Sequence, residues 1–449
     1  MTKAPISADR SLLEGSTPLH FLSPSCALPE GSEAAARLQG FTGEREQIAF
    51  TEKSVLVGVG GEGRDPLAAG AASLKLPSGT YSVAAHPQSL PLEDIARGFA
   101  LGAYRFHRYA GDGEGPRLVI PQEEIAGKIA REAASIFFGR DLINTPAEDM
   151  GPDALEDAAR RLAGSFGADI KVYQGDGFAE AFPLIHAVGR AAGPGKEPRL
   201  IELNWAGGGD KRLALIGKGV CFDSGGLNIK GGKSMGLMKK DMGGAATSLA
   251  LARRLMEEGA EINLRLLIPA VENAVSGNSF RPGDVFRSRL GKSVEISNTD
   301  AEGRLILADA MALALEGSPD RMITLATLTG AARVALGPDL PPIYSTEPQF
   351  QEKVLKAGRR LGDPMWPMPF WERYESFLAS DIADINHAAS TPFAGSITAA
   401  LFLKGFAGQV PYTHIDTFAW VPSPLPGRPK GGEVLCLRAL TAVLMGEEG

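Results

Sequence analysis

The chain has 449 residues, a formal net charge of −7 and a pI near 5.6. This acidic balance argues against a general role on nucleic acids or membrane surfaces, and no run approaches the ~20 apolar residues of a membrane span. Three cysteines cannot build a disulfide framework, and residues 1–21 contain charges but no apolar signal segment. The sequence therefore predicts a cytoplasmic protein without a membrane partner, and its length favours two domains.

The first domain is expected to be a smaller α/β unit that covers residues 1–115. Its glycine-rich turn at 60–63 lacks the lysine and hydroxyl residue of a phosphate-binding loop, so a plain tight turn is favoured over a nucleotide site. The glycine- and proline-rich stretch 111–116 is the best linker candidate. Residues 116–140 are interpreted as a linker and a connecting helix. The expected elements are strands at 48–50 and 54–59 and helices at 93–109 and 121–138.

In the second domain, residues 141–449, strands and helices alternate along the chain. A helix starts at Pro152, where proline suits the first helical turn. Such alternation predicts an α/β fold with a mostly parallel central sheet flanked by helices, and reactive groups at the carboxyl ends of the strands. The remaining expected strands are 199–203, 213–216, 263–269 and 322–328, and the helices are 245–258 and 305–316.

Charged residues cluster in three segments of this domain. In the stretch Asn298–Leu305, Asp300, Glu302 and Arg304 alternate, so in an extended strand or turn they would share one face. Glycine-rich segments after the strand 213–216 add further charges, and all three segments plausibly meet at one sheet edge. These added residues are Lys218, Asp223, Lys230 and Asp241.

Two interpretations of this cluster stay open at the level of the residues. In the first, the charges form a structural network of ion pairs. In the second, two divalent metals are held by four carboxylates, and Lys230 and Arg304 are free to attract an anionic transition state. None of the six histidines falls within these motifs, and His414 is interpreted as structural. The four carboxylates are Asp223, Asp241, Asp300 and Glu302.

The segments Gly217–Gly226 and Asn298–Leu305 resemble signatures of the leucyl aminopeptidase family, the M17 cytosolic dinuclear metallo-aminopeptidases. Residues 144–146 and 325–331 extend the resemblance, which runs from about residue 140 to the C-terminus. It implies a macro-like N-terminal domain used in assembly or regulation, a C-terminal metallopeptidase domain, and a homohexamer.

The resemblance also implies a role for each charged residue. Asp223 and Glu302 would bridge two divalent ions, Zn²⁺ or Mn²⁺ or both, with Mg²⁺ or Co²⁺ possible at the exchangeable site. Lys218 and Asp241 would complete the tighter site, and Asp300 would complete the exchangeable one.

Other residues would act on the substrate. By the same resemblance, Lys230 would polarise the scissile carbonyl, and Arg304 would hold a bicarbonate ion that takes a proton from the metal-bridging water. The backbone at Leu328 and Gly330 would help to seat that anion, and Met238 would line the pocket for the first side chain.

The implied function is release of N-terminal residues, leucine and other apolar residues preferred, from peptides with a free N-terminus. Asp384–Ala389 departs from the family pattern near the active-site rim, which puts the substrate preference in doubt. The alternative is a non-catalytic or moonlighting member that acts in assembly or DNA binding. All seven charged positions are present, which argues against a dead enzyme, and the acidic pI makes nucleic acid an unlikely partner.

Overall fold

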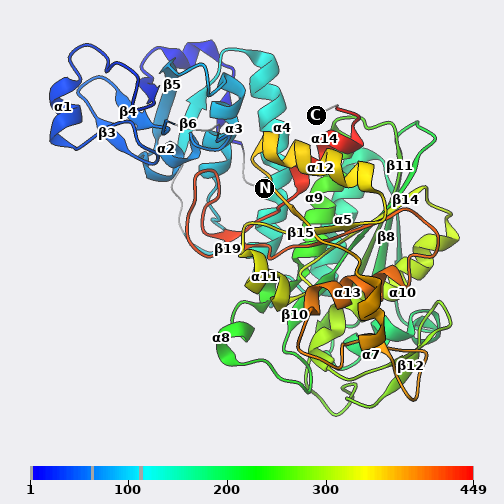
Figure 1. The fold of residues 1–449 in the computed structure, drawn as a ribbon. Coiled ribbons are helices and arrows are strands. Elements are labelled where there is room, and N and C mark those ends of the chain that lie inside the picture. The colour runs from blue at the N-terminus through cyan, green and yellow to red at the C-terminus, as the bar shows by residue number, and fades with distance from the viewer. Residues whose placement is uncertain (1–3, 62–64, 111–114, 448–449) are drawn as a thin grey trace. The chain divides into compact units, whose positions relative to one another are not determined.

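The computed structural model describes residues 4–61, 65–110 and 115–447. The chain divides into two compact units, one of Met1–Asp141, Arg360–Gly362 and Val421–Gly431, the other of the remaining segments (Figure 1). Part of the predicted glycine-rich turn, at 62–63, and most of the predicted linker, at 111–114, lie outside the described residues. No helix in the described ranges is long and apolar enough to cross a membrane.

The first unit contains a six-stranded sheet. All its strand pairs are parallel except the antiparallel pair of β3 and β4. Strand β6 falls within the segment interpreted as a linker and lies between β1 and β5, because its apolar Leu118 and Val119 are buried in this sheet. The strand order is β1 (Ile6–Ser7), β6 (Pro116–Val119), β5 (Gly79–Ala85), β2 (Thr17–Leu22), β4 (Val55–Gly58) and β3 (Ile48–Phe50). The helices are η1 (Arg10–Leu13), α1 (Glu33–Leu38), α2 (Gly70–Lys75), α3 (Leu92–Gly102) and α4 (Glu123–Asn144).

A nine-stranded sheet organises the second unit. Five of its pairings are parallel and three are antiparallel, which confirms the predicted α/β fold with a mostly parallel sheet. The order is β16 (Trp366–Pro367), β15 (Pro342–Ser345), β18 (Tyr412–Asp416), β14 (Arg321–Ala326), β9 (Arg212–Gly217), β11 (Asn263–Asn273), β8 (Arg199–Ala206) and β7 (Asp169–Tyr173), and β10 (Gly219–Asp223) also pairs with β11. Shorter strands are β12 (Val285–Arg287), β13 (Ser293–Glu295), β17 (Ile385–Asn386), β19 (Trp420–Val421) and β20 (Gly431–Gly432).

Helices cover both faces of this sheet. Figure 1 shows α7, α10 and α13 on one side and α5, α9 and α14 on the other. The longer helices are α5 (Pro152–Phe166), α9 (Gly243–Glu257), α10 (Glu302–Glu316), α12 (Pro348–Leu361), α13 (Gly395–Lys404) and α14 (Leu437–Leu444). The shorter ones are α6 (Phe178–Ala181), α7 (Pro183–Gly189), α8 (Gly232–Met235), η2 (Met238–Met242), η3 (Thr299–Ala301), α11 (Gly330–Leu336) and η4 (Glu372–Leu378).

The segment that carries Asp300, Glu302 and Arg304 is helical, so the predicted extended conformation is wrong. Asn298 accepts a hydrogen bond from the amide of Asp300 and begins η3, and Glu302 then begins α10. A carboxylate in the first turn suits the positive end of the helix dipole, which favours a helix here. Three alternating residues on a helix do not share a face, so other elements must bring these charges together.

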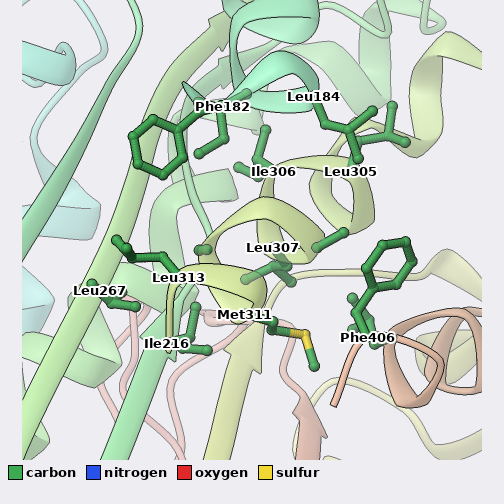
Figure 2. Packing of buried hydrophobic residues seen from close by; sticks show 14 of the residues in the cluster. Phe182, Leu184, Ile216, Leu267, Leu305, Ile306, Leu307, Met311, Leu313 and Phe406 are labelled. Atoms are coloured by element: carbon green, nitrogen blue, oxygen red, sulfur yellow. The ribbon is translucent and has the colours of Figure 1, made fainter. Parts of the chain in front are cut away.

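Helix α10 lies in the centre of the core, which fixes the position of the charges at its N-terminus. Its residues are buried all round from Glu302 to Ala314, as expected for a helix in the interior of a large domain. In Figure 2 the apolar side chains of α10 pack among residues of α7, β9 and β11 and against Phe406. The labelled residues of α10 are Leu305, Ile306, Leu307, Met311 and Leu313.

Candidate metal centre and active site

The candidate site lies at the carboxyl ends of neighbouring parallel strands. Strands β9, β10, β14 and β18 each run parallel to a neighbour in the sheet, and Lys218, Asp223 and Asp416 stand at or just after their ends. Since the carboxyl ends of parallel strands meet at one edge of a sheet, side chains from distant segments converge there.

Lys218 is an almost fully buried charge of the site, with a relative exposure of 2%. Its Nζ lies 2.7 Å from Oδ2 of Asp241 and 2.8 Å from Oε1 of Glu302, and it donates a hydrogen bond of 2.8 Å to the carbonyl oxygen of Thr327. The lysine stem needs glycine at position 303, because a Cβ there would lie 2.5 Å from its Cε. Lys218 therefore joins the end of β9, η2 and the start of α10.

Burial and charge act in opposite directions on this group. Burial alone would lower the pKa of Lys218, but the carboxylates of Asp241, Glu302 and Asp223 raise it well above its ordinary value. Burial raises the pKa of Glu302 to about 8, and the negative charge of Asp223 adds to the effect. Lys218 and Glu302 therefore hold their protons tightly unless another positive charge, such as a metal ion, replaces those protons.

Lys230 makes the second junction of the site. Its Nζ lies 2.8 Å from Oδ2 of Asp223 and in contact with Oδ1 of Asp300. The other oxygen of Asp223 accepts hydrogen bonds of 2.8 Å from the amide of Gly225 and from Nδ2 of Asn273. Burial raises the pKa of Asp223, and the nearby carboxylate of Asp241 adds to the effect. These contacts fix Asp223 in orientation while one oxygen faces its charged neighbours.

The donor set fits a divalent cation. Carboxylate oxygens of Asp223, Asp300 and Glu302 lie within 4.8 Å of one another. Three buried oxygens, from Asp241, Asp300 and Glu302, lie beside an ammonium group, yet none accepts a hydrogen bond with favourable angles from the described residues. Buried oxygens that converge without hydrogen bonds are suited to a cation that prefers oxygen ligands. The ion pairs expected of a structural network are present. The same carboxylate oxygens are also suitable ligands for divalent metals.

Arg304 lies apart from the two lysine junctions. Its Nη1 donates a hydrogen bond of 2.7 Å to the carbonyl oxygen of His387, whereas its buried Nε has no hydrogen-bond partner among the described residues. Burial lowers the pKa of Arg304 to about 10, so the guanidinium keeps its charge at neutral pH. A buried guanidinium with an unused donor is a suitable anchor for a small anion.

His387 is a supporting residue that the sequence did not reveal. It is fully buried, its Nε2 lies 2.8 Å from the carbonyl oxygen of Asn298, and its Nδ1 is within 3.4 Å of the amide of Ser297. Burial and the charge of Arg304 lower its pKa to about 3, so the ring is neutral, and its Nδ1 also lies 3.1 Å from the carbonyl oxygen of Glu295. His387 thus supports the turn before Asp300 from the residue that follows β17.

A second supporting group holds the loop after β14. Asp416 accepts hydrogen bonds from the amides of Leu328 and Thr329 and from Oγ1 of Thr329. The amide of Leu328 is therefore already used, at 2.8 Å from Asp416. Burial raises the pKa of Asp416 to about 6. Its position at the end of β18 was the signal that could have revealed it, because the residues at the ends of parallel strands were expected at the site.

These residues surround a cavity of about 500 Å³, a size that suits a small peptide. Two predicted residues, Glu302 and Arg304, are not part of the lining. The predicted residues that do line it are Lys218, Asp223, Lys230, Met238, Asp241, Asp300, Leu328 and Gly330.

A buried carboxylate cluster beside lysines, at the strand ends of an α/β sheet and open to a peptide-sized cavity, defines a candidate metal-dependent hydrolase. Residues 137–441 match the model of the cytosol aminopeptidase family, catalytic domain. A probable cytosol aminopeptidase of Geobacter sp. (strain M21) is 36% identical over 390 residues, 81% of this chain and 79% of that protein.

Solved structures agree with the sequence matches. A cytosol aminopeptidase from Coxiella burnetii superposes with a TM-score of 0.89 and 39% identity over 97% of this chain and 98% of that one. The bottromycin maturation enzyme BotP in complex with Mn gives a TM-score of 0.87 and 30% identity over 96% of this chain and 99% of that one.

The chain belongs to the cytosol aminopeptidase family. It is a metallo-exopeptidase of the leucyl aminopeptidase type, with cytosol aminopeptidase activity. The family predicted from the two sequence signatures is confirmed. The roles of individual site residues stay predictions at this point.

Proposed function

We propose that this enzyme releases leucine and other apolar residues from the free N-terminus of peptides, with the carboxylate cluster holding two divalent metals. The observation that carries the proposal is that carboxylate oxygens of Asp223, Asp300 and Glu302 lie within 4.8 Å of one another, with Asp223 and Asp300 lining the cavity. Zn²⁺ and Mn²⁺ are the proposed ions, with Mg²⁺ or Co²⁺ at the more exchangeable site. Support for Mn comes from the BotP complex, whose structure is similar to this chain.

The proposed metal ligands are those that the family resemblance implies. Asp223 and Glu302 would be shared by both ions, and each is buried beside a lysine. Asp241 and Lys218 would complete one site and Asp300 the other. When bound, the ions would lower the pKa of a coordinated water and accept the α-amine of the substrate, which explains specificity for the N-terminus.

Lys230 is proposed to act on the scissile carbonyl. Burial alone would lower the pKa of its ammonium, but Asp223 and Glu302 raise it above the ordinary value, so the group stays protonated. It lines the cavity beside Asp223 and Asp300. A protonated amine in this position can donate a hydrogen bond to the carbonyl oxygen and stabilise the negative charge that develops there.

Arg304 is proposed to hold bicarbonate through its unused donor, with the backbone near Leu328 and Gly330 helping to seat the anion and the substrate. Because the amide of Leu328 donates to Asp416, only its carbonyl oxygen remains for a ligand in this arrangement. Bicarbonate so held would be a proton acceptor close to the cavity.

The proposal extends to the domains, the assembly and the location of the protein. The N-terminal domain, residues 1–115, would serve assembly or regulation, and residues 116–140 would connect it to the catalytic domain, residues 141–449. We propose a homohexamer in the cytoplasm, as the family resemblance implies. The names of the relatives support the location.

The proposed activity is tested with matched substrates. The protein loaded with Mn²⁺ or Zn²⁺ is expected to release leucine from leucinamide and from leucyl peptides but not from their N-acetyl forms. Acetylation removes the basic α-amine and leaves the scissile bond intact. Release of free amino acids is measured by chromatography. Equal hydrolysis of blocked and free substrates would contradict an exopeptidase that recognises the N-terminus.

A further prediction concerns Arg304. Arg304→Ala is expected to lower kcat by about 10²-fold or more with little change in KM, because assistance to proton transfer is realised in the transition state. Removing bicarbonate from the buffer should slow the wild type and leave Arg304→Ala almost unchanged. Equal sensitivity of the two proteins to bicarbonate would remove Arg304 from this role. Arg161→Ala, on the exposed face of α5, is the control for loss of an arginine.

A further inference from the structure

The same cavity contains a buried cation that the proposed mechanism does not use. Lys240, in η2, lines the cavity and has a relative exposure of 5%. Its Nζ lies 4.7 Å from the ring centroid of Phe418. Its ammonium has no ion pair or hydrogen bond with any residue in the described part of the chain. A buried ammonium without a counter-charge is costly, so its position needs an explanation.

Two lining carboxylates, Asp241 and Asp416, act on the charge of Lys240, but neither forms an ion pair with it. Asp241 is engaged by Lys218 at 2.7 Å and by Oγ1 of Thr327 at 2.8 Å. Asp416 is engaged by the backbone and side chain of Thr329 and by the amide of Leu328. Both acidic groups therefore have other donors, and the amine of Lys240 lines the cavity without a bonded carboxylate.

Arg333, in α11, brings a second cation to the same ring. Its Cζ lies 4.9 Å from the centroid of Phe418, and its side chain is exposed and lines the cavity. Two cations against one aromatic ring attract the ring but repel each other. An anion near both would remove the repulsion, so the pair forms a site that favours negative charge.

The charge balance of the lining points the same way. Lys218 and Lys230 are paired with the carboxylates of the proposed metal centre. The basic residues that remain, Lys233, Lys240 and Arg333, have no acidic partner among the described residues. Of the described lining carboxylates only Asp416 lacks a cationic partner, so three basic side chains stand against one acidic side chain in this part of the cavity.

We propose that Lys240 and Arg333, beside Phe418, form a subsite for a carboxylate of the substrate. The proposal rests on the proposed peptidase function, because the anionic groups of peptides are carboxylates. Two sources have this chemistry: the side chain of an acidic first residue and the C-terminal carboxylate of a dipeptide. The subsite would add to the apolar contacts around Met238 and would widen the range of accepted peptides.

The experiment compares two pairs of substrates that differ only in charge. Glutamyl amide against glutaminyl amide tests the first side chain, and leucylglycine against leucylglycinamide tests the C-terminal carboxylate. We expect the wild type to favour the charged member of at least one pair by about tenfold in kcat/KM, the scale of one partly desolvated charge pair. The preferred pair identifies the source, and the ratio should fall at high salt because exposed charges are screened.

Variants connect the preference to the two cations. Arg333→Gln should lower the ratio of charged to neutral substrate by about threefold, since this side chain is exposed, and Lys240→Met by about tenfold. Arg161→Gln removes a charge from the exposed face of α5 and should leave the ratio unchanged. Lys240 is next to Asp241, so metal content is measured for each variant. If Lys240→Met loses metal, the ratio of charged to neutral substrate for Arg333→Gln decides whether the subsite exists.

The outcomes separate this proposal from the proposed function. Hydrolysis of leucylglycinamide with no preference for either charged substrate would overturn the subsite and leave the aminopeptidase intact. A preference that survives both variants would also overturn it. Failure of the wild type to hydrolyse any member of either pair would instead contradict the proposed function.

Discussion

Replacing Glu302 by glutamine is expected to abolish the hydrolysis of leucinamide while the protein stays folded. Glu302 has a relative exposure of 1%, and its pKa is raised to about 8 by burial and by Asp223. Glutamine matches the neutral form of this side chain in shape, so the start of α10 should tolerate the change. An amide is a much weaker ligand for a divalent cation than a carboxylate.

The loss of activity should exceed the ~10–100-fold loss that follows when a residue that only hydrogen-bonds to a metal ligand is removed. Activity, metal content after dialysis and the urea midpoint are measured together. Glu316→Gln is the matched control, because Glu316 is the exposed last residue of the same helix and pairs with the half-buried Arg289. It should keep both metal and activity. A Glu302→Gln protein with full metal content and most of its activity would rule out Glu302 as a ligand.

The matching change at Asp300 separates the two proposed sites. Asp300→Asn should lose the exchangeable ion first, because Asp300 belongs only to that site, whereas Glu302→Gln should reduce both. The side chain of Asp300 is 33% exposed and that of Glu302 is 1% exposed, so the cost to stability should be smaller at Asp300. Loss of both ions in both variants would contradict the division into a tight and an exchangeable site.

The sequence predicted the location of the site better than its local geometry. Lys218 and Asp223 follow apolar strands, and the rule that strand ends meet at one edge was sufficient to place them together. The expectation that Asp300, Glu302 and Arg304 share one face of an extended segment was wrong. A period of two belongs to a strand, whereas the segment is η3 followed by α10. These charges come together through Lys218, Lys230 and His387, which belong to other elements.

The supporting residues depend on long-range contacts that no local pattern records. His387 lies 89 positions from Asn298, to which its ring is bonded, and it sits in an irregular segment. Asp416 was within reach of prediction because it ends a strand. For Lys239 and Lys240 the sequence shows two adjacent lysines, but only packing decides which is buried: Lys239 bonds to the backbone of Asn144, and Lys240 faces the cavity.

The change Lys218→Arg should remove the tighter metal and the activity, and it distinguishes a metal ligand from a member of an ion-pair network. If Lys218 is an ammonium that pairs with Asp241 and Glu302, arginine could replace it, because arginine keeps the positive charge. As a ligand it must be a neutral amine, and a guanidinium stays protonated and repels a dication. The carboxylates around it raise the pKa of Lys218 despite burial, so a metal must displace a proton to bind.

Proton release gives this test a readout that does not depend on activity. Titration with Mn²⁺ or Zn²⁺ in buffers of different ionisation enthalpy should show about one more proton released by the wild type than by Lys218→Met. The methionine variant is needed because the stem of Lys218 lies against Gly303, where there is little space for a larger group. Lys239→Arg is the control for the same change: Lys239 lies in η2 with Asp241, but its side chain donates a hydrogen bond to the backbone of Asn144, so this variant should keep its metal. Two tightly held ions in an active Lys218→Arg protein, or equal proton release by wild type and Lys218→Met, would show that Lys218 is not a ligand and would return the ion-pair interpretation to this position.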